Sequence, residues 1–183
     1  MDRRRRPADP VDAIGPAPEQ SKPLRALLVT GVMLSLATCT SRTPVMTQAE
    51  LTDFATRYAA AWSSQDPARL ASFYAEDGSL SVNAGAPAVG RAAIAGTARS
   101  FMAGFPDMLV RLDSVSREGD RVVFRWIWTG TNTGPGGTGA AVHMTGREEW
   151  TIGADGLIAV SEGHYDDAEY QRQLQAGPPQ ARE

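Results

Sequence analysis

The chain has 183 residues, of which 42% are hydrophobic and 21% charged, and its formal net charge is −3. This length accommodates one globular domain with additional segments and leaves no room for a second domain. The acidic balance argues against nucleic acid as a partner, and the single cysteine excludes an intramolecular disulfide.

Residues 1–38 have the composition of an export leader. A basic run, Arg3 to Arg6, precedes an apolar segment, Ala26 to Ala37, in the order found in secretory signals. The apolar segment is much shorter than the ~20 residues that a membrane-spanning helix needs. The Leu-Ala-Thr sequence before Cys39 resembles a bacterial lipobox, in which the cysteine is lipid-modified. We expect an exported lipoprotein of the cell envelope, anchored to the membrane only through Cys39. Alternatively, Cys39 is an ordinary residue of a plain signal peptide or of a misassigned N-terminal extension.

A linker over residues 39–46 leads to the predicted domain, residues 47–175. Thr47 and Glu50 match a capping box, which satisfies free amide groups at the start of a helix. Apolar residues then recur at helical spacing as far as Trp62. One face of this first helix is therefore expected in the core.

Two further helices and a short strand are predicted next. Asp66-Pro67 is a helix start, and the short helix that follows carries apolar residues as far as Tyr74. Gly78 is expected to end it, before a brief strand over residues 80–82. A third helix is predicted over residues 92–103.

The second half of the domain alternates in the manner of β-strands. Four strands are predicted, over residues 108–116, 121–131, 141–152 and 157–165. Their short connections imply an antiparallel meander. A last helix begins near Asp166 and runs to about Gln175, and the tail, residues 176–183, is expected to be disordered.

This order of elements predicts an α+β domain whose helices cover one face of a sheet. Four segments, residues 57–62 (RYAAAW), 73–78 (FYAEDG), 155–158 (DGLI) and 163–166 (GHYD), resemble the SnoaL-like, polyketide cyclase-like branch of the nuclear-transport-factor-2-like superfamily. The resemblance covers roughly residues 48–174. It implies a cone-shaped, curved antiparallel sheet that encloses an apolar pocket with three N-terminal helices, and often a homodimer formed through the outer face of the sheet.

Aromatic residues of the second long strand share one face by alternation. These are Phe124, Trp126 and Trp128, which with Trp62 and Tyr58 either form ordinary core or line a pocket for a flat apolar ligand.

The third long strand places a carboxylate on the same side. Glu148 and Trp150 share the pocket-facing parity, whereas Arg125 and Arg147 have the opposite parity. An unpaired buried carboxylate has a raised pKa. Glu148 is therefore either functional or paired with an arginine.

The last strand carries the strongest chemical constellation. Alternation puts Glu162, His164 and Asp166 in one row behind Ile158, and a histidine beside a carboxylate suits general acid–base chemistry. By the resemblance, SnoaL-like cyclases use an acidic residue near the end of this strand to withdraw a proton beside a carbonyl, and Asp166 matches that position. Asp166 with Glu169 also matches a helix cap, which would lower the pKa of Asp166 and weaken it as a base.

Ketosteroid isomerases share the fold that the resemblance implies. Tyr58 matches the tyrosine that donates to the oxyanion in those enzymes. Their catalytic aspartate has no counterpart, because Val82 or Asn83 occupies its position. Double-bond isomerisation by that route is therefore not expected.

Two functions remain open for a protein that binds a small apolar ligand. The first is a cofactor-independent cyclase-, isomerase- or hydrolase-type enzyme acting on an apolar carbonyl or ester compound, with Asp166 and His164 as base pair and Tyr58 as oxyanion donor. The second is a non-catalytic envelope lipoprotein that binds a lipid or hydrophobic metabolite, which the leader favours. No redox cofactor is indicated, and the two histidines and one cysteine have no metal-ligand spacing.

Overall fold

The computed structural model describes residues 46–178, so the predicted leader, Cys39 and nearly all of the linker lie outside the described residues. The elements are α1 (Gln48–Trp62), α2 (Pro67–Ala71), β1 (Tyr74–Val82), β2 (Ala88–Val89), α3 (Arg91–Gly104), β3 (Leu109–Glu118), β4 (Arg121–Thr131), β5 (Ala141–Ile152), β6 (Ile158–Tyr165) and α4 (Asp167–Gln175). Among the described residues, no helix has the length and apolarity needed to cross a bilayer.

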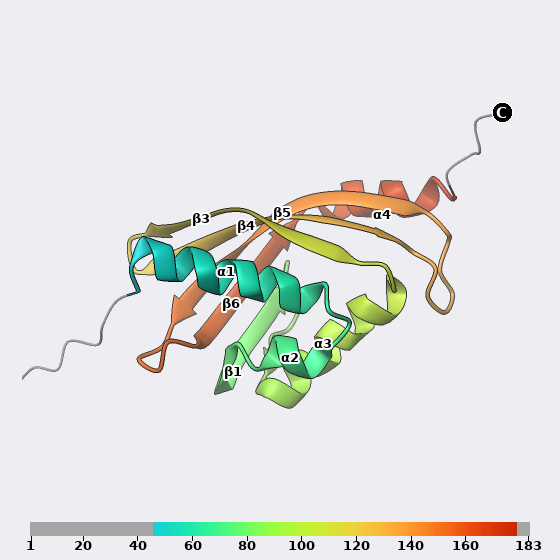
Figure 1. Cartoon of the computed structure of the whole chain (residues 1–183). Coiled ribbons are helices and arrows are strands. Elements are labelled where there is room, and N and C mark those ends of the chain that lie inside the picture. Colours follow the sequence, from blue (N-terminus) through green and yellow to red (C-terminus); the bar gives the residue numbers. More distant parts are fainter. Residues whose placement is uncertain (1–45, 179–183) are drawn as a thin grey trace, which may run out of the picture. The chain divides into compact units, whose positions relative to one another are not determined.

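All six strands belong to one curved sheet that does not close into a barrel (Figure 1), in the order β2-β1-β6-β5-β4-β3. The predicted meander of β3 to β6 is confirmed, because each of these strands pairs antiparallel with the next. The sheet is not wholly antiparallel, since β1 runs parallel to β6. A parallel pair needs a long connection, which here includes α3 and the rest of the meander, and no local turn signal reports such a pairing.

β1 is longer than the predicted strand and begins where a helix was expected. The helix α2 ends at Ala71, and Tyr74 is the first residue of β1. Gly78 does not end a helix but lies at the irregularity between β1 and β6. A Cβ at Gly78 would approach the backbone oxygen of Ile158 to 2.8 Å. Glycine is therefore required at this irregularity, because a larger residue would meet the backbone of β6.

The helices α1, α2 and α3 lie on one side of the sheet (Figure 1). The predicted capping box of α1 is present: the hydroxyl of Thr47 accepts from the backbone N–H of Glu50, and the Glu50 carboxylate accepts from the backbone N–H of Thr47. α4 is attached to β5 through Gln173, whose side chain donates to the His143 carbonyl at 3.1 Å and accepts from its N–H at 2.7 Å. This contact satisfies the backbone N–H and carbonyl of His143, which lies beyond the last β5 residue that pairs with β6.

Aromatic rings dominate the core between the helices and the sheet. Phe124 and Trp150 stack with centroids 4.8 Å apart, and the ring of Tyr58 packs edge-on against Trp150 at 4.9 Å. Tyr58, Phe124 and Trp150 are fully buried. The predicted inward face of β4 is thus confirmed.

Candidate functional site

An apolar cavity lies between the sheet and the helices α1 and α3. It contains about 530 Å³ of empty space, a volume that includes the mouth open to solvent. Its aromatic walls come from Trp62, Phe101, Trp126 and Trp128, and Glu148 is the one carboxylate in its lining. The cavity therefore offers a ligand mostly apolar surface and a single carboxylate.

Glu148 is held by three hydrogen bonds to the same oxygen. Its Oε2 accepts from the Tyr58 hydroxyl at 2.8 Å, the Ser161 hydroxyl at 2.6 Å and the Trp150 indole at 2.9 Å. No arginine pairs with it among the described residues. Oε1 receives no hydrogen bond from residues 46–178. One oxygen thus orients the carboxylate, and the other remains for a ligand.

Burial raises the pKa of Glu148 above its ordinary value, and the hydrogen bonds from Ser161, Trp150 and Tyr58 oppose that rise. Burial and the nearby Glu148 carboxylate raise the pKa of Tyr58 well above its usual value. Tyr58 therefore keeps its proton and donates a hydrogen bond to Glu148. A carboxylate with a raised pKa is a stronger proton acceptor than an exposed glutamate.

Tyr58 does not line the cavity. Its hydroxyl is bonded to Glu148 and lies 2.7 Å from the hydroxyl of Tyr74. Since the Tyr58 proton is directed to the carboxylate, the Tyr74 hydroxyl donates to Tyr58. The structure thus places the predicted oxyanion donor as a support for Glu148.

The position of the cavity-lining Trp126 ring depends on a glycine. Gly146 on β5 faces Trp126 on β4 across the ladder. A Cβ at Gly146 would lie 2.3 Å from the Trp126 ring and 2.5 Å from the backbone oxygen of His164. The indole of Trp126 therefore occupies the space that any other residue on β5 would fill.

The predicted row on the last strand is divided by a bulge. Thr151 pairs with Val160, whereas Ile152 pairs with Ile158, so Ala159 is an extra residue. Alternation reverses at that point. Ile158 does not share a face with the later even-numbered residues, which is a correction to the predicted row.

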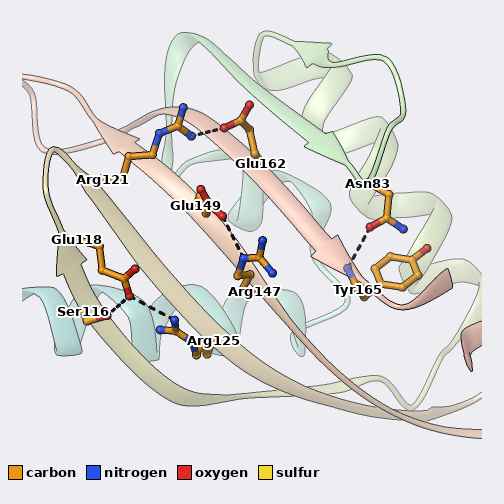
Figure 2. A network of polar contacts seen from close by, with 9 residues as sticks. All are labelled: Asn83, Ser116, Glu118, Arg121, Arg125, Arg147, Glu149, Glu162 and Tyr165. Carbon is orange, nitrogen blue, oxygen red and sulfur yellow. Dashed lines mark hydrogen bonds and ion pairs between the residues drawn. The ribbon is translucent and has the colours of Figure 1, made fainter.

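The reversal of alternation at this bulge determines which side chains of β6 face the core. Ser161 and Gly163 are buried, and Ser161 bonds Glu148. Glu162 lies opposite Glu149 on the outer face, where it pairs with Arg121 (Figure 2). Glu162 therefore does not line the cavity, contrary to its predicted role.

His164 borders both the cavity and a hollow on the outer face of the sheet. Asp166 borders only the outer hollow, is exposed, and caps α4 by accepting from the N–H of Glu169 at 3.0 Å. The predicted cap is confirmed. The role of Asp166 as a base stays a prediction.

Ion pairs between arginine and glutamate side chains lie on the outer face of the sheet (Figure 2). Arg147 pairs with Glu149 at 3.0 Å, and Arg125 lies 3.3 Å from Glu118. Both arginines have the outward orientation that alternation predicted. They are absent from the surroundings of Glu148.

Of the predicted ligand-binding residues, the cavity brings together Trp62, Trp126, Trp128 and Glu148. Phe124 and Trp150 instead belong to the stacked core behind it. Residues not predicted also line it: Leu80, Val82, Phe101, Val110, Gly163 and Tyr165. Phe101 follows the apolar spacing of the predicted third helix, which is the signal that identifies it.

Among residues 46–178, no group of three or more His, Cys, Asp or Glu side chains is arranged to hold a metal ion. The cavity lining contains a single carboxylate and a single histidine.

Residues 55–161, more than half of the chain, match the SnoaL-like domain family. A search of curated proteins finds no significant match. The chain is similar in fold to a ketosteroid isomerase-like protein from Catenulispora acidiphila solved with trimethylamine, at 23% identity and a TM-score of 0.61, over 69% of this chain and 94% of that one. It is also similar to a putative SnoaL-like polyketide cyclase from Jannaschia, at 18% identity and a TM-score of 0.59, over 74% and 100%. A third similar structure is TerC co-crystallised with polyporic acid, at 16% identity and a TM-score of 0.56, over 68% and 97%.

Proposed function

Since this chain belongs to the SnoaL-like domain family, we propose that its cavity receives a small, largely apolar molecule and that Glu148 accepts a proton from it. The proposal depends on how hydrogen bonds are distributed over the two oxygens of the Glu148 carboxylate. Oε2 accepts three of them, and Oε1 accepts none from the described residues. Two of the similar folds hold small molecules, which agrees with a ligand in this one.

Glu148 suits the role of base better than Asp166 for two reasons. It lines the apolar cavity, and burial raises its pKa. Asp166 is exposed, and its carboxylate is engaged by the first turn of α4. Proton removal from a carbon acid breaks a C–H bond, leaves the electron pair on the conjugated carbonyl and places the proton on Oε1.

Hydrogen exchange tests this chemistry directly. Isophorone, a small apolar conjugated ketone, is incubated in D₂O with the full chain, and deuterium uptake at carbon is followed by NMR. We expect uptake above the buffer rate with the wild type and with Glu149→Gln, which alters the neighbouring outward carboxylate. Glu148→Gln should return uptake to the buffer rate. Uptake that survives Glu148→Gln but is lost in Asp166→Asn would move the role of base to Asp166.

A second candidate function is binding without turnover. The almost wholly apolar lining favours it, as does the predicted leader. Retention of a small molecule in native mass spectra, with no Glu148-dependent exchange of isophorone, would support this candidate over the enzyme.

Export as a lipoprotein remains part of the proposal. It rests on the composition of residues 1–38 and on the sequence before Cys39. Mass spectrometry of the mature N-terminal peptide tests it. An unmodified Cys39 would remove the lipid anchor and, with it, the membrane attachment.

A further inference from the structure

The cavity contains a second polar group without a partner. Trp128 is 4% exposed and lines the cavity. Its Nε1 is the one buried side-chain nitrogen or oxygen of the described residues that has no hydrogen-bond partner. Buried hydrogen-bond donors in folded proteins nearly always have an acceptor, and a buried donor without one lowers the stability of the fold. An acceptor from outside the chain would relieve this cost.

Glu148 Oε1 and Trp128 Nε1, which both lack a hydrogen-bond partner among the described residues, come from different positions along the strands. Along the β4–β5 ladder, Glu148 pairs with Phe124, and Trp128 pairs with Met144. These pairs are four residues apart, which corresponds to roughly 13 Å along the strands. Between them lies the pair of Trp126 and Gly146, where the indole of Trp126 lines the cavity.

Both groups face the interior. Glu148 and Trp128 have the same inward parity, and both are buried. The neighbouring buried donors are already engaged: the Tyr58 hydroxyl bonds Glu148 and Tyr74, and the Trp150 indole donates to Glu148. Trp128 Nε1 is therefore the buried donor of the described residues that is left for a ligand.

We propose that Trp128 Nε1 donates a hydrogen bond to an oxygen of the ligand, and that the ligand is a flat, conjugated molecule with this acceptor at one end and an acidic hydrogen at the other, facing Glu148. The inference rests on the proposed function, because it takes Oε1 of Glu148 as the second contact. It names Trp128, rather than Tyr58, as the residue that meets ligand oxygen. Conjugation would carry the charge left by the departing proton toward the Trp128 end.

Three matched probes test the two ends separately. para-Hydroxyacetophenone carries a carbonyl and an acidic hydroxyl at opposite ends of one ring. Acetophenone carries only the carbonyl, and para-ethylphenol only the hydroxyl. Each is titrated into the full chain labelled with ¹⁵N in its tryptophan indoles and with ¹³C in its glutamate carboxyl groups.

The indole N–H signal of Trp128, assigned from Trp128→Phe, should move downfield with the two carbonyl probes and stay in place with para-ethylphenol. The carboxyl signal of Glu148, assigned from Glu148→Gln, should respond to the two hydroxyl probes. Trp126 should respond to all three, since its ring contacts the apolar body. A carbonyl probe that moves Trp126 but leaves the Trp128 N–H unchanged would overturn the inference and leave the proposed function standing.

Binding by the variants provides a second readout. Trp128→Phe should weaken the carbonyl probes roughly 3- to 10-fold relative to para-ethylphenol, as expected for one hydrogen bond. Trp126→Phe is the matched control and should affect the three probes equally. Equal weakening by Trp128→Phe would count against a hydrogen bond from its indole. Absence of binding by every probe would overturn the proposed function and the inference together.

Discussion

Replacement of Tyr58 by phenylalanine tests whether its hydroxyl supports Glu148 or acts as an oxyanion donor. The change removes one oxygen atom and keeps a ring that packs edge-on against Phe124 and Trp150. It deletes the bond to the Glu148 carboxylate and the bond to Tyr74. A hydrogen bond to a charged group contributes about 1.5–3 kcal/mol and a neutral one about 0.5–1.5 kcal/mol, so we expect a loss of about 2–4.5 kcal/mol in the free energy of unfolding.

Urea denaturation measures this loss, and Tyr170→Phe is the control. The hydroxyl of Tyr170 has no hydrogen bond from the described residues, and its ring is only half-buried. We expect the control to stay within about 0.5 kcal/mol of the wild type.

The same variant has a second signature in the titration of Glu148. The bond from Tyr58 is one of those that lower the pKa of Glu148 against the effect of burial. Its removal should therefore raise that pKa further, as followed through the ¹³C carboxyl signal of Glu148. An unchanged pKa together with an unchanged free energy of unfolding would refute the supporting role. In an exchange assay, a pure oxyanion donor would instead lower the rate without moving its pH dependence.

Three further predictions concern stability. Folding raises the pKa of Glu148 above its ordinary value of 4.5. The stability of the wild type relative to Glu148→Gln should therefore be greatest below pH 4.5 and should fall as the pH rises through the raised pKa. A difference in urea denaturation that stays constant between about pH 4 and pH 8 would contradict this. Gly146→Ala forces a Cβ against the Trp126 ring and should lower the free energy of unfolding by about 1–3 kcal/mol. The control is Gly96→Ala in α3, where a Cβ meets nothing within 4 Å; it should raise the free energy of unfolding by about 0.5–1 kcal/mol. Equal unfolding temperatures of the two variants would disprove the packing argument. Asp166→Ala should cost about 1 kcal/mol and Asp166→Asn almost nothing, since asparagine also caps helices; calorimetry that finds the two variants equal would argue against the cap.

The sequence was sufficient for features that depend on neighbouring residues. The capping box at Thr47, the extents of β4 and β5, and the inward face of β4 follow from patterns of a few residues, and the structure confirms them. Glu148 was placed toward the interior by simple alternation, because β4 and β5 pair without a break in register.

Features that depend on distant contacts were not predictable in the same way. The assignment of Tyr74 to a helix was wrong because its apolar character fits either a helix or a strand, and only the pairing with Ile158 decides. The row from Glu162 to Asp166 was oriented incorrectly relative to Ile158, since the alternation rule assumes that no extra residue interrupts the strand. Ser161 was missed for the same reason, although it is one of the three donors to Glu148.

The bulge at Ala159 also determines which side chains of β6 reach the interior. Deleting Ala159 would remove the bulge and keep Ser161 inward and Glu162 outward, because Val160 would then follow Ile158 in regular alternation. Pairing Ala159 within the ladder, without a bulge, would instead turn Glu162 and His164 inward and Ser161 outward. The interior would then exchange a neutral hydroxyl for a second acid and an imidazole without any amino-acid replacement. The ionisable groups available to this cavity therefore depend on the pairing register of one strand as much as on its composition.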